Sequence, residues 1–98
     1  MPDLSERAAD IAASLKQRGE TVAVAESSTG GLISASLLAV PGASAYYLGG
    51  TVVYTIEARR ALLNIADDVL QGMTPLSEDY VTLCARAMRT NLQSTWAI

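Results

Sequence analysis

The sequence contains no histidine and only one cysteine, Cys84. Without histidine, neither a Ser-His nor a Cys-His catalytic dyad can form within the chain, and the commonest metal ligand is missing. A single cysteine excludes an intrachain disulfide and a thiolate zinc cluster. We therefore expect no metal site and no cofactor, so any hydrolytic chemistry has to use hydroxyl, amine, guanidinium or carboxylate groups.

Long apolar runs and clustered positive charge are also missing. No apolar stretch approaches the roughly 20 residues that span a bilayer, and the first residues lack the basic start and apolar stretch of a signal peptide. The formal net charge is −3, and the seven basic residues are scattered over the 98 positions. We therefore expect a cytoplasmic protein that binds neither nucleic acid nor membranes.

Phenylalanine is absent and aromatic residues make up only 5% of the chain, yet half of all residues are hydrophobic. A chain this apolar is expected to fold, with a core of tightly packed Ala, Val, Leu and Ile side chains. Its length suffices for one small domain and not for two. Residues 1–98 are therefore interpreted as a single domain with at most one site.

Segments with helical and strand periodicity alternate along the chain, which predicts an α/β fold. Asp3 and Glu6 have the spacing of a capping box, and Ser77 is a second helix-capping residue. The predicted elements are a helix from Leu4 to Gly19, a buried strand over 21–25, a helix over 32–39, a strand over 51–55, a helix over 56–63 that stops at Asn64, a short helical turn over 67–71, a break around 74–75, a long helix after Ser77 and a third strand over 94–98.

Residues 25–31 (A-E-S-S-T-G-G) place hydroxyls and glycines between a predicted strand and a predicted helix. Free N–H groups and the positive helix end suit a phosphate or a developing oxyanion, and glycines let the backbone approach a ligand. Alternatively, Ser28 or Thr29 caps the helix and the glycines form a tight turn. The spacing matches neither a Walker A loop nor the G-x-G-x-x-G pattern.

Several segments, in the right order, resemble the CinA C-terminal domain family. Residues 25–31 resemble its A-E-S-C-T-G-G motif, and V-P-G-A-S-A-Y-Y at 40–47 and L-G-G at 48–50 follow at matching distances. V-Y-T-I-E-A-R at 53–59 resembles its V-x-Y-S-N-E-A-K segment, and L-S-E at 76–78 its V-S-E helix start. The resemblance implies a layered sheet with helices on both faces, of which this chain supplies the N-terminal part.

Family members with known activity are nicotinamide mononucleotide deamidases, which release ammonia from the pyridine carboxamide. The resemblance therefore implies acyl transfer on a pyridine nucleotide, with Ser27 as the nucleophile and Tyr54 orienting or relaying a proton. It also implies a substrate-binding set, which is Glu26, Ser28, Thr29, Gly30 and Gly31. The N–H groups of Thr29, Gly30 and Gly31 would be the donors around the oxyanion.

Two positions depart from the family pattern. Ser28 replaces a cysteine and leaves two adjacent hydroxyls, of which we favour Ser27 as the attacking group. Arg59 replaces a lysine, and a guanidinium cannot be deprotonated near neutral pH. If that lysine is a base, Arg59 cannot act in its place; if it pairs with a phosphate or oxyanion, Arg59 suffices.

Taken without the resemblance, the same residues have structural interpretations. Tyr54 then packs from a strand against a helix, Arg59 lies on a solvated helix face, and Glu26 bonds to nearby backbone N–H groups.

The sequence leaves two hypotheses of function. The first is a nicotinamide-nucleotide amidohydrolase that is inactive at this length, because the family's T-G-I-A-G-P-type glycine loop and further strands are missing. The second is a non-catalytic interaction or oligomerisation module. A three-stranded parallel sheet that ends near Trp96 and Ile98 exposes an edge, so we expect a homo-oligomer in either case.

Overall fold

The structure, a computed structural model, describes residues 3–74 and 77–98. Residue 75, in the predicted break, and residue 76, in the L-S-E segment, lie outside the described residues. In chain order the elements are α1 (Leu4–Arg18), β1 (Val22–Glu26), α2 (Leu32–Leu38), the 3-10 turn η1 (Ala43–Ala45), β2 (Tyr47–Val52), α3 (Ile56–Ala58), the π-helical turn η2 (Arg59–Leu63), the 3-10 turn η3 (Asp67–Leu70), α4 (Glu78–Leu92) and β3 (Trp96–Ala97).

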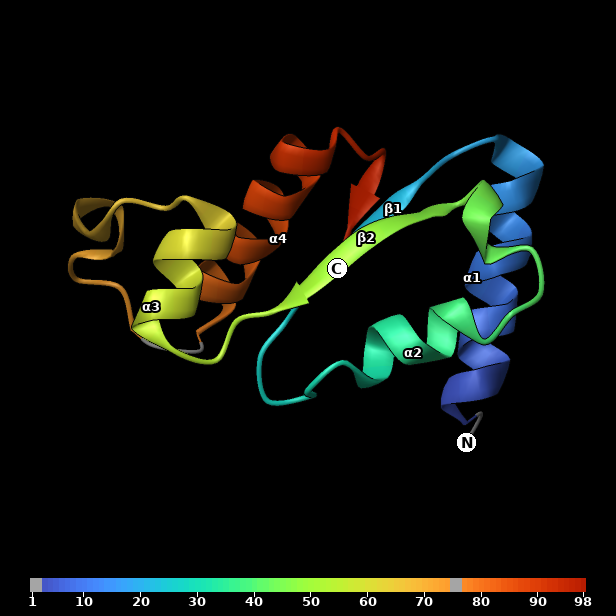
Figure 1. The fold of residues 1–98 in the computed structure, drawn as a ribbon, viewed down its shortest axis with the longest axis horizontal. Coiled ribbons are helices and arrows are strands. Elements are labelled where there is room, and N and C mark those ends of the chain that lie inside the picture. Colours follow the sequence, from blue (N-terminus) through green and yellow to red (C-terminus); the bar gives the residue numbers. More distant parts are fainter. Residues whose placement is uncertain (1–2, 75–76) are drawn as a thin grey trace.

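The three strands form a parallel sheet in the order β2-β1-β3, with β1 in the centre. Figure 1 shows α4 on one side of the strands and α1 and α2 on the other. The side chains of β1 alternate between the two faces, because Val22 and Val24 pack with α1 and α2 whereas Ala23 packs with α4. The predicted α/β class, with helices on both faces of a layered sheet, is confirmed.

The second strand begins and ends earlier than the sequence predicts. We expected residues 51–55, whereas β2 covers Tyr47–Val52 and includes both glycines of the L-G-G segment. Gly50 pairs with Val24 of β1 and lies under the hydroxyl of Tyr47, so that a Cβ there would come within 2.7 Å of this oxygen. The glycines therefore lie inside the strand, where they permit a close approach of neighbouring groups.

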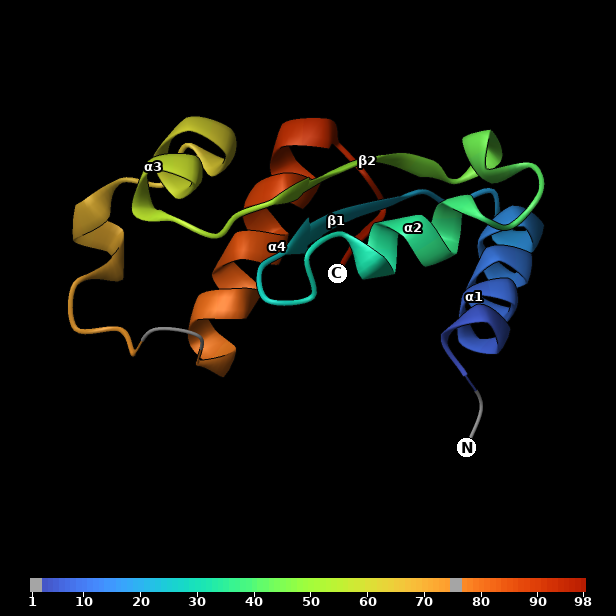
Figure 2. The same ribbon diagram turned by 60° about the horizontal axis from the view of Figure 1, so that its bottom comes forward.

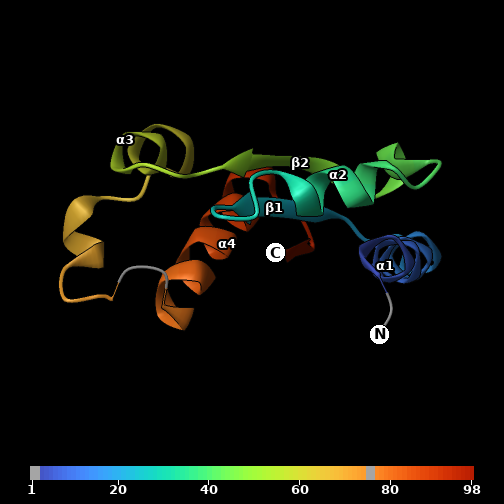
Figure 3. The ribbon, with the colours of Figure 1, turned by 90° about the horizontal axis from the view of Figure 1, so that it is seen from below.

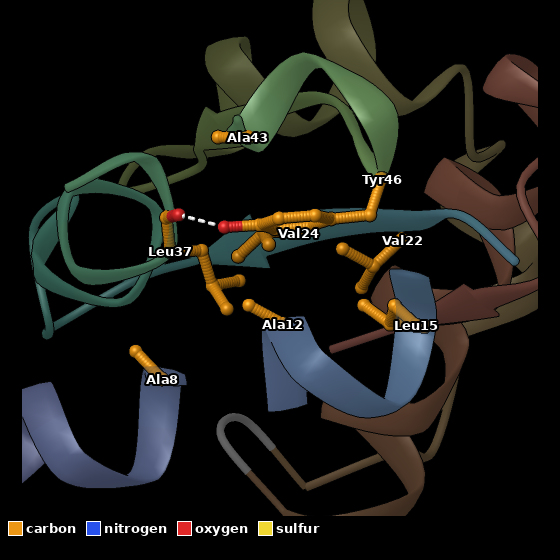
Figure 4. Packing of buried hydrophobic residues seen from close by; sticks show 8 residues of the cluster. All are labelled: Ala8, Ala12, Leu15, Val22, Val24, Leu37, Ala43 and Tyr46. Carbon is orange, nitrogen blue, oxygen red and sulfur yellow. Dashed lines mark hydrogen bonds between the residues drawn. The ribbon is translucent and has the colours of Figure 1, made fainter. Parts of the chain in front are cut away.

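The first core cluster lies between β1, α1 and α2 (Figure 4). At its centre is Tyr46, which is fully buried and donates its hydroxyl hydrogen to the backbone carbonyl of Leu37. The rest of the cluster is aliphatic, as predicted from the composition. Its other members are Ala8, Ala12, Leu15, Val22, Val24 and Ala43.

The second core cluster lies on the opposite face of β1. Cys84 and Met88 of α4 pack there against Ala23 and against Leu63 at the end of η2. Figures 2 and 3 show α3 beyond the end of β2, at the opposite end of the molecule from α1. This cluster therefore fixes the segment after β2 against α4, which forms one wall of the site described below.

The predicted helix ends at Asp3, Gly19, Ser77 and Asn64 are confirmed, whereas the helix predicted over 56–63 is divided into the three-residue α3 and the π-helical η2. Asp3 caps α1 by accepting a hydrogen bond from the Glu6 N–H at 2.9 Å, and Gly19 ends this helix with a φ of 63°. Ser77 caps α4 by accepting from the Tyr80 N–H at 3.2 Å, and Asn64 ends η2 with a φ of 55°. Within the described part of the chain, no helix is long and apolar enough to cross a membrane.

Two threonines distant in the sequence join β1 to β3. The N–H of Thr21 donates to Oγ1 of Thr95 at 3.1 Å, and the N–H of Thr95 donates to Oγ1 of Thr21 at 3.0 Å. Trp96 continues the connection, because its N–H donates to the carbonyl of Thr21 at 2.9 Å. The β3 segment is therefore held to the start of β1 before the strand ladder begins.

Candidate functional site

The serine loop, residues 27–31, follows the carboxyl end of β1 and leads into α2. Glu26 pairs with Val52, so the segment after β2 leaves the sheet at the same edge as the loop. The N–H of Val53 extends this pairing by donating to the carbonyl of Glu26 at 2.6 Å. The carboxyl edge of a parallel sheet is a common position for ligand sites.

A pocket of about 620 Å³ opens at this edge, within the range of small-molecule sites. It brings together four of the predicted site residues: Ser27, Ser28, Tyr54 and Arg59. The remaining lining residues are Val53, Thr55, Ile56, Leu70, Met73 and Tyr80. The pocket therefore combines hydroxyl groups and one cation with an apolar and aromatic wall.

The other predicted loop residues lie beside this pocket rather than in its wall. Thr29 lines a neighbouring hollow that also includes Ser27 and Ser28 and reaches Ile98 of the β3 segment. Gly30 and Gly31 have φ values of 62° and 101°, which favour glycine. The tight turn considered as the alternative role of the glycines is therefore present.

Glu26 closes the serine loop from beneath. Its buried carboxylate accepts hydrogen bonds from the backbone N–H of Ile33 at 2.8 Å and of Ser34 at 3.0 Å. Burial opposes ionisation, but these bonds and those from the Thr29 and Ser34 hydroxyls outweigh it and lower the pKa of Glu26.

The start of α2 therefore differs from both interpretations of the sequence. Two of its amides are occupied by Glu26 instead of being free for a ligand, and Glu26 rather than Ser28 or Thr29 acts as the cap. This is the alternative role that the sequence allowed for Glu26. Within the loop, the N–H of Gly30 donates to the carbonyl of Ser27 at 3.0 Å.

Tyr54 and Arg59 contradict their structural interpretations. Tyr54 lies beyond the end of β2 and is 78% exposed, so it does not serve as a packed strand residue. The side chain of Arg59 is only 12% exposed, so it does not lie on a solvated helix face. Both side chains border the same pocket as the two serines.

Arg59 is held in place by Asp67, a contact that no sequence pattern indicated. A terminal nitrogen of Arg59 donates to Oδ1 of Asp67 at 2.8 Å, and Arg60 donates to the same carboxylate from Nε at 3.1 Å. The hydrogen bond from Arg60, together with that from Arg59, outweighs burial and lowers the pKa of Asp67 to about 2. The carboxylate thus stays ionised and joins η3 to η2.

Tyr80 forms the α4 side of the site, and the buried Cys84 lies one helical turn further along α4. Burial raises the pKa of both the Tyr80 hydroxyl and the Cys84 thiol. Cys84 belongs to the second core cluster and does not line the pocket, whereas Ser27 and Ser28 do, so the serine hydroxyls are the better candidates. Sequence reasoning placed both residues in an apolar helix stripe but did not predict that Tyr80 lines the pocket.

Comparisons with known proteins agree on one family. The family model described as "CinA C-terminal domain" matches residues 4–98. A CinA-like protein from Prochlorococcus marinus (strain MIT 9313) is 45% identical over 84 residues, which cover 86% of this chain and 20% of that protein. A CinA-like protein from Myxococcus xanthus is 38% identical over 91 residues, or 93% of this chain and 22% of that protein.

Solved structures give the same result. The competence/damage inducible protein from Agrobacterium tumefaciens superposes with a TM-score of 0.88 at 30% identity, covering 99% of this chain and 59% of the other. The competence damage-inducible protein A from Klebsiella pneumoniae has a TM-score of 0.89 at 29% identity, covering 98% and 60%. The chain thus spans about a fifth of its curated relatives and about three fifths of these solved chains.

Proposed function

Because the chain belongs to the CinA C-terminal domain family, we propose that residues 1–98 are the N-terminal part of a nicotinamide-nucleotide amidohydrolase domain. The proposed reaction converts nicotinamide mononucleotide and water into nicotinic acid mononucleotide and ammonia. One observation carries this proposal: Ser27, Tyr54 and Arg59, which come from three separate segments, border a single pocket. The proposed setting is the cytoplasm, which stays a prediction.

In the proposed reaction the Ser27 hydroxyl attacks the carboxamide carbon, and its proton passes through the Tyr54 hydroxyl to the departing nitrogen. The C–N bond breaks, ammonia leaves, and water then hydrolyses the serine ester to release the carboxylate. The N–H groups of Thr29 and Gly31 would face the oxyanion. The N–H of Gly30 already donates to the Ser27 carbonyl, so it is the weaker donor for this role.

Arg59 acts in this scheme through its charge and not as a base, because a guanidinium keeps its proton. Its fixed position beside Asp67 supports an electrostatic role. If the reaction needs a base at this position, turnover is expected to be slow even in a complete domain. Replacing Arg59 with lysine is expected to raise it if a basic amine is what the reaction lacks.

Ammonia release from nicotinamide mononucleotide tests the proposal. We expect little release from the 98-residue chain and measurable release from a chain extended through the glycine loop of a relative. In that extended chain, Ser27→Ala should abolish turnover while largely keeping substrate binding, because only a transition-state role is removed. Ser28→Ala is the matched control and should have a much smaller effect; unchanged release in Ser27→Ala would eliminate Ser27 as the nucleophile.

A second candidate function, an association module, is favoured by the surface around β3. Trp96 is 49% exposed on this edge, and with Ile98 it borders a hollow of about 400 Å³ against α1. Exposed apolar groups beside an unpaired strand edge favour self-association. Light scattering at micromolar concentrations should give a dimer or larger species, and Trp96→Ser should weaken it more than Val69→Ser; a clean monomer would contradict this function.

A further inference from the structure

The pocket beside the serine loop has a single charged residue, Arg59, in the wall that the described residues form. Asp67 and Arg60 lie behind this wall and do not line the pocket. Arg59, Arg60 and Asp67 together carry a charge of +1, and Glu57, whose charge also acts on Arg60, does not line the pocket. The electrostatic potential inside the pocket therefore favours a ligand with a negative group.

The hydrogen bonds of Arg59 indicate where that group would bind. One terminal nitrogen donates to Asp67, but Nε is buried and has no hydrogen-bond partner among the described residues. Nε has almost no accessible surface, so a ligand would meet the part of the Arg59 side chain that borders the pocket rather than this atom. The planar guanidinium, with several donors, matches the geometry of carboxylates and phosphates.

We infer that Arg59 forms an oxyanion-binding subsite, which holds a carboxylate or phosphate group of the ligand. The aromatic rings of Tyr54 and Tyr80 and the side chain of Met73 border the same space and would accommodate a flat heteroaromatic ring. The identity of that ring rests on the proposed function, whereas the preference for an anion rests on Arg59 alone. If the anion is a carboxylate, the deamidated product binds more tightly than the amide.

Arg60 provides a matched control for this inference. It pairs with the same carboxylate as Arg59 and carries the same charge, but its side chain is 55% exposed and lies outside the pocket. Substitution of either arginine removes one positive charge and its hydrogen bonds to Asp67, of which Arg59 makes one and Arg60 two. Only the Arg59 substitution removes the cation that borders the pocket.

The test is an NMR titration of the 98-residue chain at constant ionic strength with three probes. Pyridine-3-carboxamide carries no charge, pyridine-3-carboxylate carries the carboxylate, and ribose 5-phosphate carries the phosphate. We expect at least one anion to bind about tenfold more tightly than the amide and to shift the guanidinium N–H resonances of Arg59. Whichever anion does so identifies the source of the oxyanion.

The variants then assign the effect to one residue. Arg59→Gln should reduce anion binding to the level of the amide, and Arg60→Gln should stay within about twofold of the original chain. The guanidinium readout uses the unaltered chain, so it holds even if Arg59→Gln folds poorly. Equal binding of all three probes, or an equal loss in the two variants, would overturn the inference.

This outcome is separable from that of the amidohydrolase proposal. Ser27→Ala should keep the preference for anions, because Ser27 contributes no charge to the pocket. Anion binding without ammonia release in the extended chain would contradict the proposed reaction and still support the subsite. Ammonia release without any preference for anions would support the proposed reaction and overturn the subsite.

Discussion

Glu26 and Ser34 are joined by a 3.0 Å hydrogen bond from the Ser34 N–H to the buried Glu26 carboxylate. The bond connects the last residue of β1 to the third residue of α2, so that the serine loop between them is closed at its base. Because the carboxylate also accepts from Ile33, the loop is held by two bonds that do not involve its own side chains. Its geometry therefore depends on a residue outside the hydroxyl and glycine positions.

We predict that Glu26→Gln lowers the free energy of unfolding by about 1–3 kcal/mol, because the new amide can face only one backbone donor with its oxygen. Urea unfolding measures the effect. Glu57→Gln is the control, since Glu57 is exposed and should change stability little. Equal midpoints for the two variants would show that the loop does not depend on this carboxylate.

Loss of the hydroxyl should lower the stability of the fold at Tyr46 and the rate of ammonia release at Tyr54. Tyr46→Phe removes a buried bond to the Leu37 carbonyl and should cost about 1–2 kcal/mol of stability. Tyr54→Phe should leave stability unchanged, because the side chain is exposed, but should reduce ammonia release in an extended chain. Thermal unfolding and the ammonia assay together separate the two roles, and a stability loss in Tyr54→Phe would contradict this assignment.

Gly50→Ala should destabilise the sheet by about 1–3 kcal/mol through overpacking. The added methyl would lie 2.7 Å from the Tyr47 hydroxyl and 2.8 Å from Oγ of Ser34, which are hydrogen-bonded to each other. Gly49→Ala is the control, because its nearest contact would be the flexible end of Leu92 at 3.2 Å. Denaturant unfolding of both variants measures the difference, and equal stabilities would contradict the close contacts at Gly50.

The pH dependence of the Asp67 contacts follows from its pKa, which is lowered from 3.8 to about 2 in the folded chain. A lowered pKa means that the stabilising contacts are complete above about pH 4 and are lost as the pH falls through about 2. Titration of the Asp67 carboxyl carbon by NMR should show this value. Arg60→Gln should raise it further towards 3.8 than Arg59→Gln, because the bond from Arg60 is the leading cause; the opposite order would contradict this geometry.

The parts of the fold that depend on local chemistry were predictable from the sequence. Asp3, Gly19 and Ser77 act within one helical turn, so their positions alone fixed the helix ends. The bounds of β2 were not predictable in this way, because Tyr47 and Gly50 belong to the strand through pairing with β1. Local propensity instead favoured the β-branched residues that follow.

In the candidate site, too, some features were predictable from the sequence and others depend on tertiary contacts. The resemblance selected Ser27, Tyr54 and Arg59, and the structure places all three around one pocket. The contact of Arg59 with Asp67 arises from the path of the chain through η2 and η3 and leaves no periodic signal in the sequence. The sequence likewise did not indicate that Glu26 caps α2, because Glu26 lies seven residues before Ile33 and acts across the loop.

The reciprocal bonds between Thr21 and Thr95 also constrain the order in which the chain can fold. The two residues are separated by 74 positions, so the contact closes a long loop and is slow to form compared with a helix. During synthesis β1 emerges well before β3, and one edge of the central strand stays unpaired in the meantime. This edge is therefore where a nascent chain is most exposed to misassembly with its neighbours.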